Sequence, residues 1–251
     1  MKKLKNYIKN YIDESVWDIE DNVESDNKEL MLDSVKKFIK DNYINIKLKR
    51  CEFIFDEKKE KYVVNYDQQV NLKPIAKQLT NEVFEWGEVD WNFNCSDCPE
   101  LTTLQGAPER VDGAFDCHSC RELTSLKGGP KYVGGFFDCS ECPKLTSLEG
   151  APKYVDGAFD CHSCRELTSL KGAPKTVGGG FLCFECPKLK SLKGAPKEVG
   201  EDFNCSDCPE LTTLEGAPEY VGGNFDCYEC PKLSSLDGIG KVKGEIINNL
   251  G

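Results

Sequence analysis

The sequence predicts an α+β protein, in which a solenoid with one parallel β-ladder on its inner curve follows a small helical and β-hairpin cap. Three observations predict this fold. Residues 93–246 divide into seven consecutive units of 22 residues without any insertion. Before them, apolar residues recur at helical spacing, and two runs rich in β-branched and aromatic residues flank a charged turn. A constant period of this length is typical of solenoids, whose units each pack on their neighbours.

The seven units share the residue types expected of a buried core. Every unit has Phe at position 1, Cys at positions 3 and 6, Leu at positions 9 and 12, and Gly at position 14, from FNCSDCPELTTLQGAPERVDGA at Phe93 to FDCYECPKLSSLDGIGKVKGEI at Phe225. Alternation along a short strand points positions 1 and 3 inward, and the leucines continue the core. The GAP stretch and the following Gly-Gly or Asp-Gly pair are expected to turn the chain back.

The FxCxxCxxL stretch has the spacing of the LxLxxNxL consensus of leucine-rich repeats. The sequence pattern LTSLxGAPxxVGGxFxCxxC resembles the short bacterial and phage-type repeats of that family. The chain therefore resembles the leucine-rich repeat family over about three-fifths of its length. This resemblance implies protein binding but no particular partner, because a fold does not fix a function. One departure is that Cys replaces the Asn that bonds backbone groups in many members, and a thiol is a weaker donor.

The cysteine pairs allow a second interpretation. Successive CxxC pairs have 18 residues between them, as in Cys117, Cys120, Cys139 and Cys142, which fits a four-cysteine zinc pattern. However, the pattern overlaps along the chain, and one pair cannot complete two tetrahedral sites. The core positions of these cysteines favour buried, reduced thiols, with no metal and no cofactor, and leave bound metal or disulfides as alternatives. None is predicted to be a nucleophile, because a reactive thiolate needs partial exposure and a positive environment.

Composition narrows the classes of partner. The chain has 43 acidic and 32 basic residues and a formal charge of -11, which argues against direct nucleic-acid or anionic-membrane binding and favours a protein with a basic surface. The N-terminus lacks the apolar core of a secretory signal, and no stretch approaches about 18 consecutive apolar residues. The sequence thus predicts a cytoplasmic protein, and it does not predict an oligomeric state.

The exposed positions of the predicted strands carry the candidate site. If positions 1 and 3 point inward, positions 22, 2 and 4 lie on the inner curve. Asp occupies position 2 in three consecutive units, and aromatic residues interrupt otherwise polar rows, which is typical of an interface centre with a polar rim. The predicted partner-binding residues are Asp116, His118, Phe136, Asp138, Asp160, His162, Leu182, Phe184, Asp226 and Tyr228. His118 and His162 fit no triad order, so no catalytic residue is predicted.

The segments outside the repeats are expected to cover the solenoid or to dock elsewhere. Apolar residues at helical spacing predict two amphipathic helices, and CEFIF and YVVNY around DEKKEK predict a hairpin. Solenoids need atypical ends, and the stretch from residue 71 keeps the repeat register without its cysteines. The expected division is two helices in 1–43, hairpin and degenerate capping repeat in 44–92, repeats in 93–246, and a tail in 247–251.

The leading hypothesis is a non-enzymatic binding protein whose acidic and aromatic inner curve engages a basic protein surface. A phage protein that acts on a host factor fits this hypothesis. The alternatives are an acidic inhibitor that mimics nucleic acid, a virion or structural component and, less favoured, a zinc-binding CxxC protein. Strong salt dependence and competition by DNA would distinguish the inhibitor.

Overall fold

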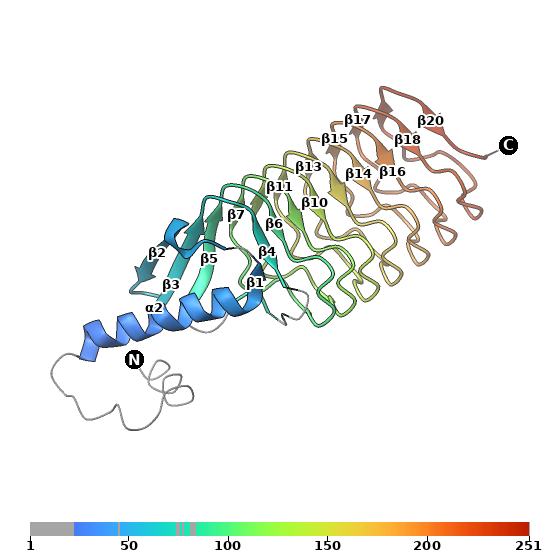
Figure 1. Cartoon of the computed structure of the whole chain (residues 1–251). Coiled ribbons are helices and arrows are strands. Elements are labelled where there is room, and N and C mark those ends of the chain that lie inside the picture. The colour runs from blue at the N-terminus through green and yellow to red at the C-terminus, as the bar shows by residue number, and fades with distance from the viewer. Residues whose placement is uncertain (1–22, 45, 74–75, 77, 81–83, 251) are drawn as a thin grey trace.

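The structure, a computed structural model, describes the chain except at its ends and a few loop residues. The described residues are 23–44, 46–73, 76, 78–80 and 84–250. They form a β-solenoid of about eight turns with a period of about 22 residues, and the turns stack along one axis (Figure 1). The first of the two expected helices falls in residues 1–22 and lies outside the described residues.

One ladder, sheet A, contains positions 1 and 2 of every repeat. The repeat strands are parallel, and each Phe lies opposite the Phe of the next unit, as Phe137 does opposite Phe159. At one edge β1 pairs antiparallel with β4. In sheet order the strands are β1 (Tyr43–Ile44), β4 (Val70–Leu72), β6 (Phe93–Asn94), β8 (Phe115–Asp116), β10 (Phe137–Asp138), β12 (Phe159–Asp160), β14 (Phe181–Leu182), β16 (Phe203–Asn204), β18 (Phe225–Asp226) and β20 (Ile246–Ile247).

A second ladder, sheet B, shows that the expectation of a single ladder is wrong. Position 19 is Val in the first six units, and these valines are at most 2% exposed, so they form a second inward strand just before the Gly-Gly, Asp-Gly or Gly-Glu pair. Val155, for example, lies opposite Val177 in the next unit. In sheet order the strands are β19 (Lys241–Val242), β17 (Tyr220–Val221), β15 (Glu198–Val199), β13 (Thr176–Val177), β11 (Tyr154–Val155), β9 (Tyr132–Val133), β7 (Arg110–Val111), β5 (Phe84–Val89), β3 (Lys61–Tyr66) and β2 (Cys51–Asp56).

The N-terminal end of the solenoid carries a helix and a hairpin. Helix α2 (Val23–Asn42) buries Met31, Val35 and Ile39, which recur every four residues and are at most 2% exposed, so one face of the helix packs on the core. A short 3-10 turn, η2 (Leu48–Arg50), leads into β2, which pairs antiparallel with β3 and extends sheet B. Within the described residues no helix is long and apolar enough to cross a membrane.

The strands between the hairpin and the repeats already belong to the solenoid. In sheet A, Val70 lies opposite Phe93, and in sheet B, Val89 lies opposite Val111. Leu79, which lies between Val70 and Val89 in the sequence, is fully buried. These residues give the first repeat a neighbour on its N-terminal side.

Rows of identical side chains fill the interior. The seven Phe rings at position 1 stack with centroids 5.1 to 5.5 Å apart. The cysteines at positions 3 and 6 are at most 1% exposed, and so are the leucines at position 9 except Leu233, at 5%. Each turn therefore completes its core only by contact with its neighbours.

The glycine at position 14 is required by the backbone. All seven of these glycines have φ between +87° and +100°, a region that L side chains rarely adopt. A Cβ on Gly172 would also lie 2.4 Å from the carbonyl oxygen of Leu148 in the neighbouring turn. The turn needs both the conformation and the space that glycine provides.

Candidate functional site

Short turns after the sheet A strands are closed by the side chain at position 2. Oδ1 of Asp138 accepts hydrogen bonds from the backbone N–H and the hydroxyl of Ser140, at 2.9 and 2.6 Å. Asn204 accepts the equivalent backbone bond from Ser206 at 2.8 Å. These Asx turns explain why position 2 is Asp or Asn in every unit except the fifth, which has Leu182.

Both histidines fold back onto such an aspartate. Nδ1 of His118 lies 2.8 Å from Oδ1 of Asp116, and Nδ1 of His162 lies 2.8 Å from Oδ1 of Asp160. The surroundings of the two rings differ. Asp116 lies opposite Asp138 in the parallel ladder, whereas Asp160 lies opposite Leu182 on the side of the following unit.

The charges around the first histidine change its titration. Burial alone lowers the pKa of His118, but the hydrogen bond to Asp116 and the charges of Asp116, Asp138 and Asp97 outweigh burial and raise the pKa above the ordinary 6.5. In the fourth unit, burial raises the pKa of Asp160 above its ordinary value, although the hydrogen bonds from His162 oppose it. His118 thus lies in a field of three carboxylates.

The second histidine has an aromatic neighbour. The rings of His162 and Phe184 are stacked, with centroids 4.5 Å apart and planes 6° apart. Leu182 and Phe184 are half-buried, so part of each remains accessible on this surface. His162, Leu182 and Phe184 thus lie together where the second and third units have His118, Asp138 and Ser140.

Position 5 of each unit adds a row that the sequence analysis missed. Every residue there has φ between +51° and +56°, which is uncommon for residues other than glycine. Five of the seven are acidic, and we call them the acidic row: Asp97, Glu141, Glu185, Asp207 and Glu229. The signal in the sequence is the recurrence of an acid directly before the second cysteine in five of the seven CxxC pairs.

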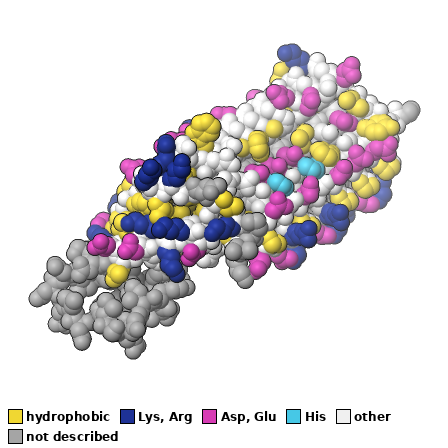
Figure 2. Space-filling model, in the orientation of Figure 1, with side chains coloured by type: hydrophobic (Ala, Val, Ile, Leu, Met, Phe, Trp, Pro, Cys, Tyr) yellow, Lys and Arg dark blue, Asp and Glu magenta, His cyan; other side chains and the backbone are white. Residues whose placement is uncertain are grey.

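The acids of this surface differ in their ion pairs from the glutamates at positions 8, 13 and 17. Seven Lys–Glu pairs link neighbouring units at positions 8, 13 and 17, and Lys144–Glu122 at 2.5 Å is an example. In the described part of the chain, no Asp or Glu at position 2 or 5 forms an ion pair with Lys or Arg. Figure 2 shows acidic side chains around both histidines.

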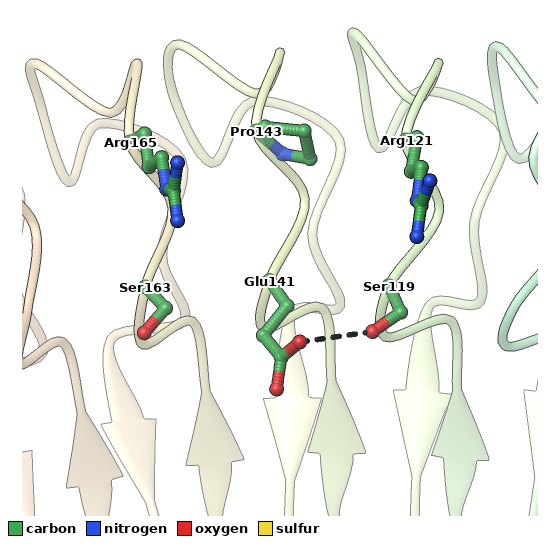
Figure 3. Close-up of a pocket in the computed structure, with 6 residues that line it drawn as sticks. All are labelled: Ser119, Arg121, Glu141, Pro143, Ser163 and Arg165. Carbon is green, nitrogen blue, oxygen red and sulfur yellow. Dashed lines mark hydrogen bonds between the residues drawn. The ribbon is translucent and has the colours of Figure 1, made fainter.

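A hollow of about 380 Å³ lies beside the acidic row, across units two to four (Figure 3). Arg121 and Arg165 flank it, with Pro143 at the same position of the unit between them. Glu141 lies at its lower side and accepts a hydrogen bond from the hydroxyl of Ser119 at 3.2 Å. The hollow therefore presents two cationic groups around one carboxylate.

The sequence-predicted site residues do not all lie as expected. Phe136 and Tyr228 are each 46% exposed. The other eight predicted residues are half-buried, and two serines at position 4, Ser140 and Ser206, are buried. Positions 2 and 4 are thus only partly accessible because the Asx turn draws position 4 toward position 2. The structure brings Asp116, His118 and Asp138 together, and separately His162 and Phe184.

The cysteines take over the bonding role of the missing asparagines. From the second unit on, each position 6 thiol donates to the backbone carbonyl of the position 3 cysteine one unit earlier, at sulfur–oxygen distances of 3.2 to 3.5 Å. Burial raises the pKa of these thiols, for Cys120 and Cys164 to about 12. All the cysteines are free of disulfides, and no described group of three possible metal ligands within 4.8 Å includes one. These properties favour a structural role for the thiols.

The fold and this surface define a β-solenoid with two parallel ladders and an acidic side that, within the described residues, forms no ion pair with Lys or Arg. In comparisons with known proteins, no family model matches the chain, and no curated protein or solved structure is significantly similar to it.

Proposed function

We propose that the protein is a non-enzymatic binding protein, and that the surface formed by positions 22, 2, 4 and 5 of the repeats, the sheet A face, engages a basic protein surface. The single observation that supports this most is that the acids of this face have no Lys or Arg ion partner among the described residues, whereas seven glutamates at positions 8, 13 and 17 each pair with a lysine of a neighbouring unit. Repeated negative charge that the chain leaves unpaired suits a partner that supplies lysine or arginine.

The aromatic residues give this partner an anchor. Tyr228 and Phe136 are exposed, and Phe184 lies on His162 beside the acidic row. Interfaces combine apolar anchors with a polar rim that sets orientation and on-rate. The units also share the inward-residue spacing of leucine-rich repeats, so we propose a distant relationship to that family, from which the second ladder is a departure.

A charge-matched pair of variants tests the proposal. The first neutralises four acids of the acidic row: Asp97→Asn, Glu141→Gln, Glu185→Gln and Asp207→Asn. The control neutralises four acids that pair with lysines: Glu109→Gln, Glu122→Gln, Glu166→Gln and Glu219→Gln. Both change the net charge by four, so a difference between them reports position and not total charge.

The measurement is the affinity for a protein captured from the producing or infected cells, at two salt concentrations. Four lost contacts of about 0.5 kcal/mol each weaken binding roughly 30-fold in the first variant, with little change in the control. Equal weakening in both variants, or none, would contradict the proposal. A partner that is released by added DNA would instead support the nucleic-acid-mimicking inhibitor.

A further inference from the structure

Two carboxylates and an imidazole converge at the second and third units. Asp116, His118 and Asp138 each offer one ligand atom, and these atoms all lie within 4.8 Å of one another. The register of β8 and β10 places the two aspartates opposite each other, and the turn after β8 returns the histidine to Asp116. Among the described residues, no other three His, Cys, Asp or Glu residues come together in this way.

The negative charge of this cluster is not needed for the fold. Asn94 and Asn204 close the same turn that Asp116 and Asp138 close, so an amide would suffice there. Two neighbouring carboxylates repel by roughly 1 kcal/mol even in water, and more strongly when half-buried. No lysine or arginine of the described chain pairs with either aspartate. The cluster thus carries an excess of negative charge that a bound cation would relieve.

The donor set indicates which cations fit. Two donors bound to one ion at about 2.1 Å lie roughly 3.0 Å apart in octahedral geometry and roughly 3.4 Å apart in tetrahedral geometry, so the 2.8 Å between Nδ1 of His118 and Oδ1 of Asp116 has to widen by only a few tenths of an ångström. An ion can therefore replace the proton that these atoms share. Imidazole with carboxylates suits zinc and its neighbours in the first transition row, whereas Ca²⁺ and Mg²⁺ prefer oxygen ligands alone.

We propose that Asp116, His118 and Asp138 bind a divalent transition-metal ion, with Zn²⁺ as the reference ion. Three protein ligands leave at least one coordination position for water or for a group from a bound molecule. Asp97 lies on the other side of the ring, with its Oδ2 3.8 Å from Nε2 of His118, so a further negative charge faces the nitrogen that does not bind the ion. The site does not depend on the proposed protein partner.

The fourth unit is an internal control for this site. Asp160 and His162 repeat the pair at the same 2.8 Å, but Leu182 stands where the third ligand would come from, and Phe184 covers the ring. The chain contains only these two histidines, so their imidazole signals in a nuclear magnetic resonance spectrum can be followed separately. Zinc binding at the proposed site affects one histidine and not the other.

The test titrates Zn²⁺ into the reduced full-length protein and records both histidine signals and the affinity by calorimetry. We expect one equivalent to shift the signals of His118 while those of His162 stay in place. Asp138→Asn keeps the turn, as Asn204 does, and removes a ligand charge, so it weakens binding at least about tenfold. The matched control, Asp226→Asn, makes the same change away from any histidine and leaves the affinity unchanged.

Three results would overturn the proposal. Zinc that binds without moving either histidine signal is held elsewhere, for example by thiolates. Signals of His118 and His162 that shift in parallel indicate weak binding to exposed imidazoles. An affinity of Asp138→Asn equal to that of the unaltered protein removes the third ligand from the site.

Discussion

The two ends of the solenoid differ in how they finish the same stack of turns. At the N-terminal end, Phe93 contacts the rings of Trp86 and Tyr43, with centroids 6.1 and 6.3 Å away, and both of these side chains are buried. At the other end, Phe225 lies opposite Ile246, which is 41% exposed. The repeats are nearly identical, so this difference shows that the protection of a turn depends on its neighbours more than on its own residues.

A hydrogen-bonded aromatic group holds the N-terminal end together. Nε1 of Trp86 donates to the hydroxyl of Tyr43 at 2.8 Å, and that hydroxyl donates to the carbonyl oxygen of Leu79. Burial strongly raises the pKa of Tyr43, although the bond from Trp86 opposes this, so the hydroxyl remains a donor. In the last turn, Val242 is half-buried, and Ile247 is 37% exposed.

The largest difference is expected from truncation at the two ends. Trp86→Ala removes a fully buried ring and should lower the free energy of unfolding by about 3 to 5 kcal/mol, whereas Ile246→Ala should lower it by less than about 1 kcal/mol. Urea unfolding followed by circular dichroism measures both values. Similar losses in the two variants would mean that the ends are equally important for stability.

Hydrogen exchange should show the same gradient along sheet A without any substitution. The backbone N–H groups of Phe115 and Phe225 both donate at 2.9 Å to the next turn, to Phe136 and Glu245. Only the turn that follows Phe225 is largely exposed, so it opens more easily. We expect the amide of Phe225 to exchange at least about 100-fold faster than that of Phe115. Equal exchange rates would show that the solenoid opens only as a whole.

Thiol ionisation should begin at the C-terminal end. Burial raises the pKa of Cys227 to about 11, and it raises the pKa of the fully buried Cys161 well above the ordinary value of 9. A raised folded pKa keeps the thiol protonated, so the stability these thiols contribute is complete below the ordinary pKa of 9 and is lost as the pH rises toward the folded pKa. At pH 10, alkylation of the folded protein should therefore modify Cys227 before Cys161, as peptide mass spectrometry can show. Equal alkylation of Cys227 and Cys161 would indicate that both thiols become accessible only when the whole protein unfolds.

The sequence predicted the interior better than the surface. The Phe, Cys and Leu rows are identical in every unit, and identical residues at a fixed period indicate the core without knowledge of the backbone. The second ladder was missed because the valine at position 19 stands directly before the residues interpreted as a turn, as Val155 does before Asp156 and Gly157. A single buried residue beside a turn gives no alternation of apolar and polar residues, which is the pattern that predicts a strand.

The candidate site depended on register and turn geometry, which the repeat pattern contains only indirectly. His118 reaches Asp116 through an Asx turn, and Asp138 joins them because equivalent positions of neighbouring units lie opposite each other. The acidic row points outward because position 5 adopts a left-handed backbone. The half-burial of Phe184 depends on a stack with a residue 22 positions earlier. These contacts between units can be predicted only once the register of neighbouring strands is known.

The smallest expected effect concerns exposed ion pairs, and it separates packing from surface charge. Lys144–Glu122 and Lys232–Glu210 have nearly the same separations, 2.5 and 2.6 Å, at different distances from the open end. Exposed pairs contribute little and depend on local geometry, so Lys144→Met and Lys232→Met should each lower the Tm by less than about 2 °C and by similar amounts. A larger loss from Lys144→Met would mean that the last turns are already open in the native state, so that the pair of Lys232 has nothing left to stabilise. Equal small decreases in Tm would show that the two ends of the solenoid differ only in their buried contacts.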